Sequence, residues 1–185
     1  MLLKKIDKIN DGHYISRYDL TYETSDCKEK VYEIISRNKH ITEPTMLNDS
    51  PVDSVVLIIH DENNEHILLN KEFRLAVNEW VYNFPAGLID PGETALEAGK
   101  RELFEETGLT LDRIDDIIPA SFGAVGFSNE KNLCIVGTAS GEFRESTSTV
   151  EEIEANWYTK SEVRRLLEKE MFAARTQAYC YLWSK

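Results

Sequence analysis

Cysteine is scarce in this chain of 185 residues. It has only three cysteines, Cys27, Cys134 and Cys180, and they lie far apart in the sequence. Disulfide frameworks and zinc sites need cysteines in even numbers or at close, regular spacing. The sequence therefore excludes a disulfide-rich scaffold and predicts three reduced thiols with a structural role.

Long hydrophobic runs are also missing. The longest apolar run is Val55–Ile59, whereas a membrane-spanning helix needs about 18 or more apolar residues. The first residues, Met1–Lys5, carry charge after a very short apolar start and have no small-residue cleavage site, which is not the pattern of a signal peptide. We therefore expect a cytoplasmic protein that does not bind membranes.

Basic residues are too few to dominate the surface. The 33 aspartates and glutamates outnumber the 21 lysines and arginines and give a net charge of -12. Proteins that bind duplex nucleic acid through its backbone need a basic face, so such a partner is not expected. A small anionic substrate remains possible, because a divalent metal ion can reverse the sign of the local charge.

The segments that are present predict an N-terminal strand region followed by a main domain. Residues 13–36 alternate loosely and are rich in tyrosine, isoleucine, valine and threonine, with a break at Ser25 and Asp26, which predicts an antiparallel β-hairpin. A polar connector that contains Pro44 and Pro51 follows. We therefore expect an N-terminal strand region over residues 1–50 and a main domain over residues 51–185.

The main domain mixes strands and helices without regular β-α-β alternation. This pattern favours an α+β domain with a layered mixed sheet over a doubly wound one. The expected strands cover residues 52–59, 66–69, 117–122, 133–138 and 153–158, and the expected helices cover residues 94–107, 161–170 and 173–183.

The first of these helices carries an unusual group of acids. Glu102, Glu105 and Glu106 stand at positions i, i+3 and i+4, so their carboxylates share one arc of the helix about 100° wide. Clustered carboxylates repel one another, and a hard cation such as Mg²⁺ or Mn²⁺ relieves that repulsion. Arg101 lies one turn before Glu105 and can hold one carboxylate in place. On these residues alone, a solvated acidic face with an Arg101–Glu105 ion pair is the better interpretation.

The spacing around these acids resembles the Nudix box. The pattern is Gly, five residues, Glu, seven residues, and then Arg-Glu-aliphatic-any-Glu-Glu-any-Gly-aliphatic. All of its positions are matched, by Gly87, Glu93, Arg101, Glu102, Leu103, Glu105, Glu106, Gly108 and Leu109. The resemblance implies the Nudix fold, a mixed β-sheet sandwiched between α-helices. It also implies hydrolysis of a nucleoside diphosphate linked to another group X.

The same resemblance implies roles for individual residues. A magnesium site, or a manganese site, would use Glu102, Glu105, Glu106 and the backbone carbonyl of Ala86. Arg101 would orient the acids. Gly87 and Glu93, in the loop before the helix, would bind the substrate. Glu93 would also support the junction between loop and helix or bind an outer metal ion.

Segments outside the box are similar to the ADP-ribose pyrophosphatase branch of this family. Before the helix, the similar segments are residues 71–74 and 84–87. Arg74 matches an arginine of that branch and would contact the diphosphate. Residues 126–130 resemble a mobile loop whose glutamate, here Glu130, would position or deprotonate the attacking water. Ala124, Val125 and Gly126 stand where the branch usually has Ser-Pro-Gly, so the identity of X stays open.

The N-terminal strands have a counterpart in this branch as well, where such strands exchange between the subunits of a homodimer and offer aromatic rings to adenine. Tyr14, Tyr18 and Tyr22 recur every four residues, which on a strand places them on one face. That face could bind adenine or pack beneath the sheet. The resemblance thus predicts hydrolysis of ADP-ribose to AMP and ribose 5-phosphate. The alternatives are another nucleotide sugar, a dinucleotide, or a Nudix module that binds ADP-ribose without cleaving it.

Overall fold

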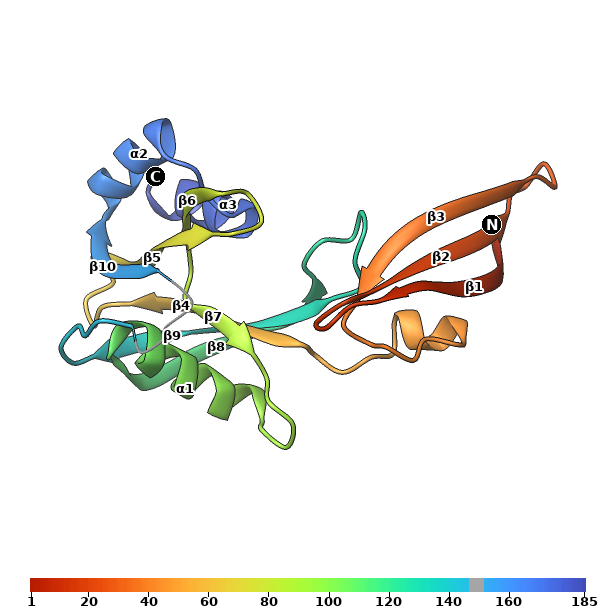
Figure 1. The fold of residues 1–185 in the computed structure, drawn as a ribbon. Coiled ribbons are helices and arrows are strands. Elements are labelled where there is room, and N and C mark those ends of the chain that lie inside the picture. The colour runs from red at the N-terminus through yellow and green to blue at the C-terminus, as the bar shows by residue number, and fades with distance from the viewer. Residues whose placement is uncertain (147–151) are drawn as a thin grey trace. The chain divides into compact units, whose positions relative to one another are not determined.

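The computed structural model describes residues 1–146 and 152–185 (Figure 1). These residues form two compact units. The first unit comprises residues 1–53 and 120–132, and the second comprises residues 54–119 and 133–185. The division into an N-terminal region and a Nudix domain at residues 50 and 51 stays a prediction, since the first unit also takes in a later segment.

The first unit is built on a three-stranded antiparallel sheet in the order β1-β2-β3. The strands are β1 (Leu2–Asp11), β2 (Ser16–Glu23) and β3 (Glu29–Ser36). The sequence predicted β2 and β3 but missed β1. Most side chains of β1 are exposed and its register with β2 shifts twice. Backbone pairing and the packing of Leu3 and Ile6 against the small core hold β1 in place, and its side chains show no apolar alternation.

A small core beneath this sheet contains Tyr18, Leu20, Ile34 and Ile41. Tyr18 is fully buried and its hydroxyl donates to the carbonyl oxygen of Asn38 over 2.8 Å, so Tyr18 packs beneath the sheet. Tyr14 lies before β2 and is 74% exposed. The prediction of one face shared by three tyrosines is therefore wrong for Tyr14, because the strand begins two residues later.

The second unit holds a seven-stranded sheet. Its central order is β10-β5-β4-β9-β8, with β6 paired to β5 and β7 paired to β4. The strands β6 and β7 were not predicted, because segments of five and three residues are too short to show a period. The bounds are β4 (Ser54–His60), β5 (His66–Arg74), β6 (Glu79–Asn83), β7 (Ala86–Leu88), β8 (Thr110–Phe122), β9 (Lys131–Ser140) and β10 (Ile153–Thr159).

Helices cover both faces of this sheet (Figure 1). They are α1 (Ala95–Thr107), α2 (Lys160–Lys169) and α3 (Ala174–Trp183). Alternate residues of β4 point to opposite faces: Val55 and Leu57 join the core that includes Leu103 of α1, whereas Val56 joins the core that includes Val163 of α2. This alternation confirms the predicted mixed sheet between helices.

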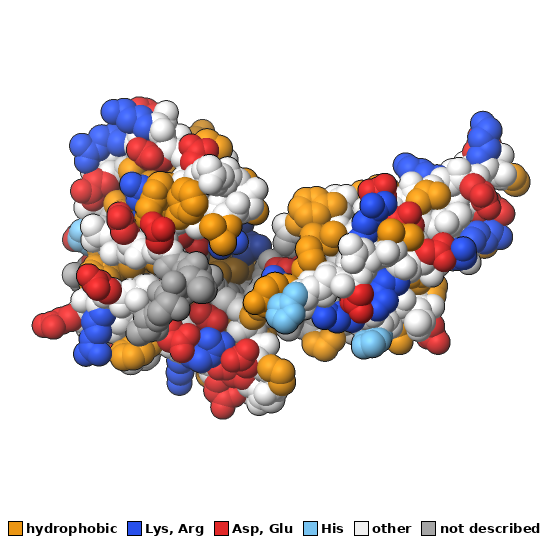
Figure 2. Space-filling model, in the orientation of Figure 1, with side chains coloured by type: hydrophobic (Ala, Val, Ile, Leu, Met, Phe, Trp, Pro, Cys, Tyr) orange, Lys and Arg blue, Asp and Glu red, His pale blue; other side chains and the backbone are white. Residues whose placement is uncertain are grey.

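The surface carries both acidic and basic side chains, as the composition indicates. Figure 2 shows acidic and basic side chains side by side, with a group of both over the region where Figure 1 places α1 and the loop before it. No helix in the described part of the chain is long and apolar enough to cross a membrane. All three cysteines are free thiols, as predicted, with Cys134 and Cys180 buried and Cys27 exposed.

Candidate active site

The acidic helix α1 begins and ends where the sequence predicts. The side chain of Thr94 accepts a hydrogen bond from the backbone N–H of Glu97, and the Glu97 carboxylate accepts one from the backbone N–H of Thr94. Together these bonds form a capping box. At the other end Gly108 adopts a left-handed conformation with φ of 80°, which is a common helix terminator. Local contacts alone therefore fix where α1 starts and stops.

A tight turn before α1 places Glu93 against Arg101. The backbone N–H of Glu93 donates to the carbonyl of Asp90 over 3.0 Å, and Gly92 supplies the positive φ of 89° that the turn needs. The guanidinium of Arg101 then donates to both carboxylate oxygens of Glu93 over 3.0 and 2.9 Å. A further donation to the carbonyl oxygen of Leu88, over 2.9 Å, ties the loop to the helix.

Arg101 also holds two of the clustered acids. Its Nη1 donates to Glu102 over 2.7 Å and to Glu105 over 3.2 Å. These bonds raise the pKa of the guanidinium, with the bond to Glu93 as the largest cause. The Arg101 side chain in turn lowers the pKa of Glu93. One arginine thus bonds three carboxylates, and its role in orienting the acids for a metal stays a prediction.

Glu106 has different surroundings from its neighbours. It is only 7% exposed, whereas the side chain of Glu105 is 45% exposed. Its Oε2 accepts hydrogen bonds from Nδ2 of Asn70 over 2.8 Å and from the backbone N–H of Ala86 over 3.3 Å. Burial raises the pKa of the Glu106 carboxyl well above its ordinary value, and the negative charges of Glu102 and Glu72 raise it further.

The absence of a side chain at Gly87 makes room for Glu102. A Cβ atom at residue 87 would lie 1.9 Å from both Cδ and Oε1 of Glu102, far inside contact distance. The carboxylate of Glu102 therefore lies directly against the backbone of β7, and Glu106 bonds to the preceding residue of that strand. The fold thus brings Ala86, Gly87, Glu102 and Glu106 together.

The chemistry of this donor set suits a hard divalent cation. Carboxylate oxygens are the ligands that Mg²⁺ and Mn²⁺ prefer, and a cation would offset the repulsion between Glu102 and the buried Glu106. In the described residues no three side chains of His, Cys, Asp or Glu are gathered closely enough to hold a metal ion on their own. Arg101 bonds to Glu102 and Glu105, and Asn70 bonds to Glu106. A cation would compete with Arg101 for these oxygens.

Replacing Arg101 by lysine is expected to reduce kcat/KM about 10- to 100-fold, the range typical of residues that orient metal ligands. A lysine ammonium has three N–H donors on one atom and cannot replace the five donations that the planar guanidinium of Arg101 makes. Steady-state kinetics at several Mg²⁺ concentrations would check this. The control is Arg113→Lys, because Arg113 forms an exposed ion pair with Asp115 in the same unit. Equal kinetics in the two variants would show that Arg101 does not orient the acids.

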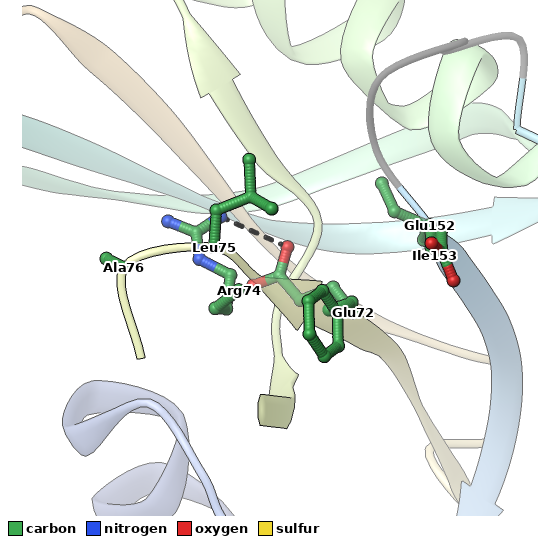
Figure 3. A pocket seen from close by; sticks show the side chains of 7 residues that line it. Glu72, Arg74, Leu75, Ala76, Glu152 and Ile153 are labelled. Carbon is green, nitrogen blue, oxygen red and sulfur yellow. Dashed lines mark hydrogen bonds and ion pairs between the residues drawn. The ribbon is translucent and has the colours of Figure 1, made fainter. Parts of the chain in front are cut away.

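Arg74 stands at the end of β5, beside a pocket of about 170 Å³ (Figure 3). Its Nη1 donates to the carboxylate of Glu72 over 3.3 Å, and Glu152 lies across the pocket. Glu72 lines this pocket, and its negative charge contributes to the raised pKa of Glu106. The side chain of Arg74 is 54% exposed and is accessible to an anionic group.

Glu130 lies in the first unit, in the segment after β8. Its Oε2 accepts a hydrogen bond from Nε of Arg37 over 2.8 Å, and both side chains are about one-third exposed. The backbone N–H of Ile35 also donates to the carbonyl of Phe127 over 2.8 Å. The predicted loop is therefore tied to β3 and the residues that follow it, a set of contacts that the sequence did not indicate.

The sequence missed a buried polar chain next to the acids. Thr176 of α3 donates to Asn83 over 2.8 Å, and Asn83 donates to Glu72 over 2.9 Å. Asn70 and Glu72 are two residues apart, so their side chains lie on the same side of β5. Asn70 also contacts Glu106. The only signal in the sequence is a polar residue, Asn70, immediately after the apolar run Ile67–Leu69.

A mixed sheet that presents clustered carboxylates from one covering helix is an arrangement suited to metal-assisted chemistry on phosphates. The NUDIX domain model matches residues 50–180, so the chain belongs to the Nudix family. The predicted family and fold are therefore confirmed.

Curated relatives carry more specific names. The chain is 32% identical over 137 residues to the ADP-ribose pyrophosphatase of Saccharomyces cerevisiae, with 72% of this chain and 55% of that protein covered. It is 26% identical over 141 residues to the ADP-sugar pyrophosphatase of Mus musculus, with 76% and 62% covered. The chain thus spans somewhat more than half the length of these relatives.

A solved structure shares the architecture. A crystal structure of an ADP compounds hydrolase superposes with a TM-score of 0.72 and 19% sequence identity, over 99% of this chain and 92% of that chain. At this identity the likeness supports the fold, and the substrate has to be argued from the site and its relatives.

Proposed function

We propose that this protein is a magnesium-dependent pyrophosphohydrolase of ADP-ribose or a closely related nucleotide sugar, with Mn²⁺ as an alternative ion. The observation that carries the proposal is the placement of the Glu102 and Glu106 carboxylates against β7, with Arg101 holding the neighbouring acids. The yeast and mouse relatives named for ADP-ribose and ADP-sugars favour this substrate class.

In the proposed reaction water attacks one phosphorus of the diphosphate and the bridging P–O bond breaks. From ADP-ribose the products are AMP and ribose 5-phosphate. A bound Mg²⁺ would neutralise the diphosphate and lower the pKa of the attacking water. Glu102, Glu106 and the carbonyl of Ala86 would hold the ion, and Glu105 would share in its binding. Arg74 would bind the diphosphate, while Gly87 and Glu93 would shape the loop on the substrate side.

Product analysis on a panel of substrates tests this function. Purified protein in Mg²⁺ would be incubated with ADP-ribose, ADP-glucose, UDP-glucose, NADH and a diadenosine polyphosphate, and the products identified by mass spectrometry. AMP and ribose 5-phosphate should form fastest. Faster cleavage of another compound would support the metal chemistry but assign a different group X to the substrate. Binding of ADP-ribose without any cleavage would identify a non-catalytic module instead.

Glu130 is proposed as the general base, on the resemblance of residues 126–130. Since Arg37 holds this carboxylate in the first unit, the base must leave that ion pair to act. Glu130→Gln is expected to lower kcat about 10²- to 10⁴-fold, the range for loss of a general base, with little change in KM. The control is Glu29→Gln, at an exposed site on β3. An effect on KM alone would make Glu130 a binding residue.

The proposed assembly is a homodimer formed through the N-terminal strands. In its support, β1 and β3 carry apolar side chains that are at least half exposed, Ile9 at 50% and Val31 at 56%. Light scattering should give about twice the 21.2 kDa of one chain. Val31→Lys should shift the mass toward the monomer, whereas Leu182→Lys, on the exposed surface of α3, should not. A wild-type monomer at micromolar concentration would refute the dimer.

The predicted cytoplasmic location and the absence of nucleic-acid and membrane partners remain part of this proposal. The free thiols favour the cytoplasmic location, and the excess of acidic residues disfavours a nucleic-acid partner. Fractionation of the cells that make the protein would test the location directly.

A further inference from the structure

Asn70 is a buried polar residue that directly follows the apolar run Ile67–Leu69 of β5. It lies on β5, is 1% exposed, and points to the same face of the strand as Leu68. Leu68 packs in the core that contains Leu103 of α1. A polar side chain in such a position carries a desolvation cost unless hydrogen bonds replace water.

The hydrogen bonding of Asn70 is directed at one acid. Its Nδ2 donates to Oε2 of Glu106 over 2.8 Å. The backbone N–H of Ala86 donates to the same oxygen over 3.3 Å. Neither bond uses Oε1 of Glu106, so the two donors fix the rotation of the carboxylate while leaving one oxygen for a cation.

Stability alone does not account for this side chain. The Oδ1 atom of Asn70 is buried and has no hydrogen-bond partner among the described residues. Buried polar atoms are rarely left unpaired, and an aliphatic residue at this position would avoid that cost. The bond to Glu106 is the interaction that an aliphatic residue could not make.

We propose that Asn70 is a positioning residue for the metal site, which holds Glu106 in the orientation that binds the divalent ion. This inference rests on the proposed function, because it assigns Glu106 as a ligand. Hydrogen bonds to carboxylate ligands fix their orientation and contribute to metal affinity. Asn70 acts through Glu106 and does not itself touch the substrate.

The test is Asn70→Val, which removes the donor and suits a β-strand. Binding of Mn²⁺ alone would be followed by the electron paramagnetic resonance signal of the free ion, alongside steady-state kinetics with ADP-ribose. We expect the Kd for Mn²⁺ to rise about 10- to 100-fold and kcat to fall, with little change in KM for ADP-ribose at saturating metal.

The matched control is Val163→Ala, which opens the buried core on the other face of the sheet without touching the acids. It should lower the melting temperature and leave the Kd for Mn²⁺ unchanged. If Asn70→Val does not fold, as judged by circular dichroism, Asn70→Leu provides the same test with a larger side chain.

The outcomes separate the two proposals. Wild-type protein that binds Mn²⁺ and cleaves ADP-ribose, together with an Asn70→Val variant of unchanged Kd, would overturn the positioning role and leave the function standing. Wild-type protein that binds no Mn²⁺ would overturn the proposed function and this inference with it. Cleavage of ADP-ribose by the wild type, together with a higher Kd for Mn²⁺ in Asn70→Val but not in Val163→Ala, would support both.

Discussion

Replacing Glu106 by glutamine should lower kcat at least about 100-fold, which is beyond the usual effect of residues that only orient a ligand, while making the metal-free protein more stable. Glutamine keeps the size of the side chain and the acceptor for Asn70 and Ala86, but it removes the charge that a cation would bind. The same charge is buried beside Glu102 and Glu72. Its loss should therefore raise the free energy of unfolding.

The direction of the pH effect follows from the raised pKa of Glu106. Between the ordinary carboxyl pKa and this higher folded-state pKa, the unfolded chain has lost the proton that the folded chain keeps. The metal-free wild type should therefore lose stability as pH rises through that window. Glu106→Gln should flatten this dependence.

Thermal melts in chelator at several pH values, together with kinetics in Mg²⁺, would measure both effects. Glu168→Gln, at an exposed site on α2, is the control and should change neither. Activity near the wild-type level at saturating Mg²⁺ would exclude Glu106 as a metal ligand. A less stable metal-free variant would show that the buried charge is already well compensated in the fold.

The second large effect is expected from Gly87→Ala. The new Cβ would overlap the carboxyl group of Glu102 at 1.9–2.4 Å, so Glu102 must leave β7. Since the obstructed atoms are the end of a flexible side chain, the fold should survive. We expect kcat/KM to fall about 100-fold, as a displacement of about 1 Å at a reacting centre can produce, with a melting temperature close to that of the wild type.

Gly99→Ala is the matched control for this substitution. Its Cβ would lie 2.9 Å from Cδ1 of Ile135 and 3.5 Å from Cδ2 of Leu57, so it disturbs the packing of α1 on the sheet and not the acids. Overpacking of this kind costs typically about 1–3 kcal/mol, partly offset by the roughly 1 kcal/mol gain in helix propensity. Its stability should change while its Mn²⁺ affinity does not. If Gly87→Ala retains full activity, Glu102 does not need its place on β7.

The acidic helix is the part of the structure that the sequence determined most completely. Its start rests on Thr94 and Glu97, three residues apart, and its end on Gly108. The relative spacing of Arg101 and Glu105 likewise decides that they can pair on one helix turn. Interactions between residues so close in the chain depend on local geometry, and so a pattern of residue types was enough to predict them.

Elements held by pairing with distant partners were predicted less well. The strand β1 pairs with β2 through its backbone while most of its side chains are exposed, so its residue types carry little signal. The short strand β6 forms by pairing with β5, and β7 forms by pairing with β4. Their existence depends on the assembled sheet and not on their own composition.

Only the tertiary structure distinguished the three clustered acids. Helix spacing alone leaves Glu102, Glu105 and Glu106 equivalent, but in the fold the side chain of Glu105 is 45% exposed and Glu106 is 7% exposed. That difference comes from β5 and β7, which supply Asn70 and Ala86, 36 and 20 residues away in the chain. The sequence by itself determined that this helix carries three acids on one arc. Packing against the sheet decided which carboxylate is buried, because burial and hydrogen bonding depend on neighbours that only folding brings together.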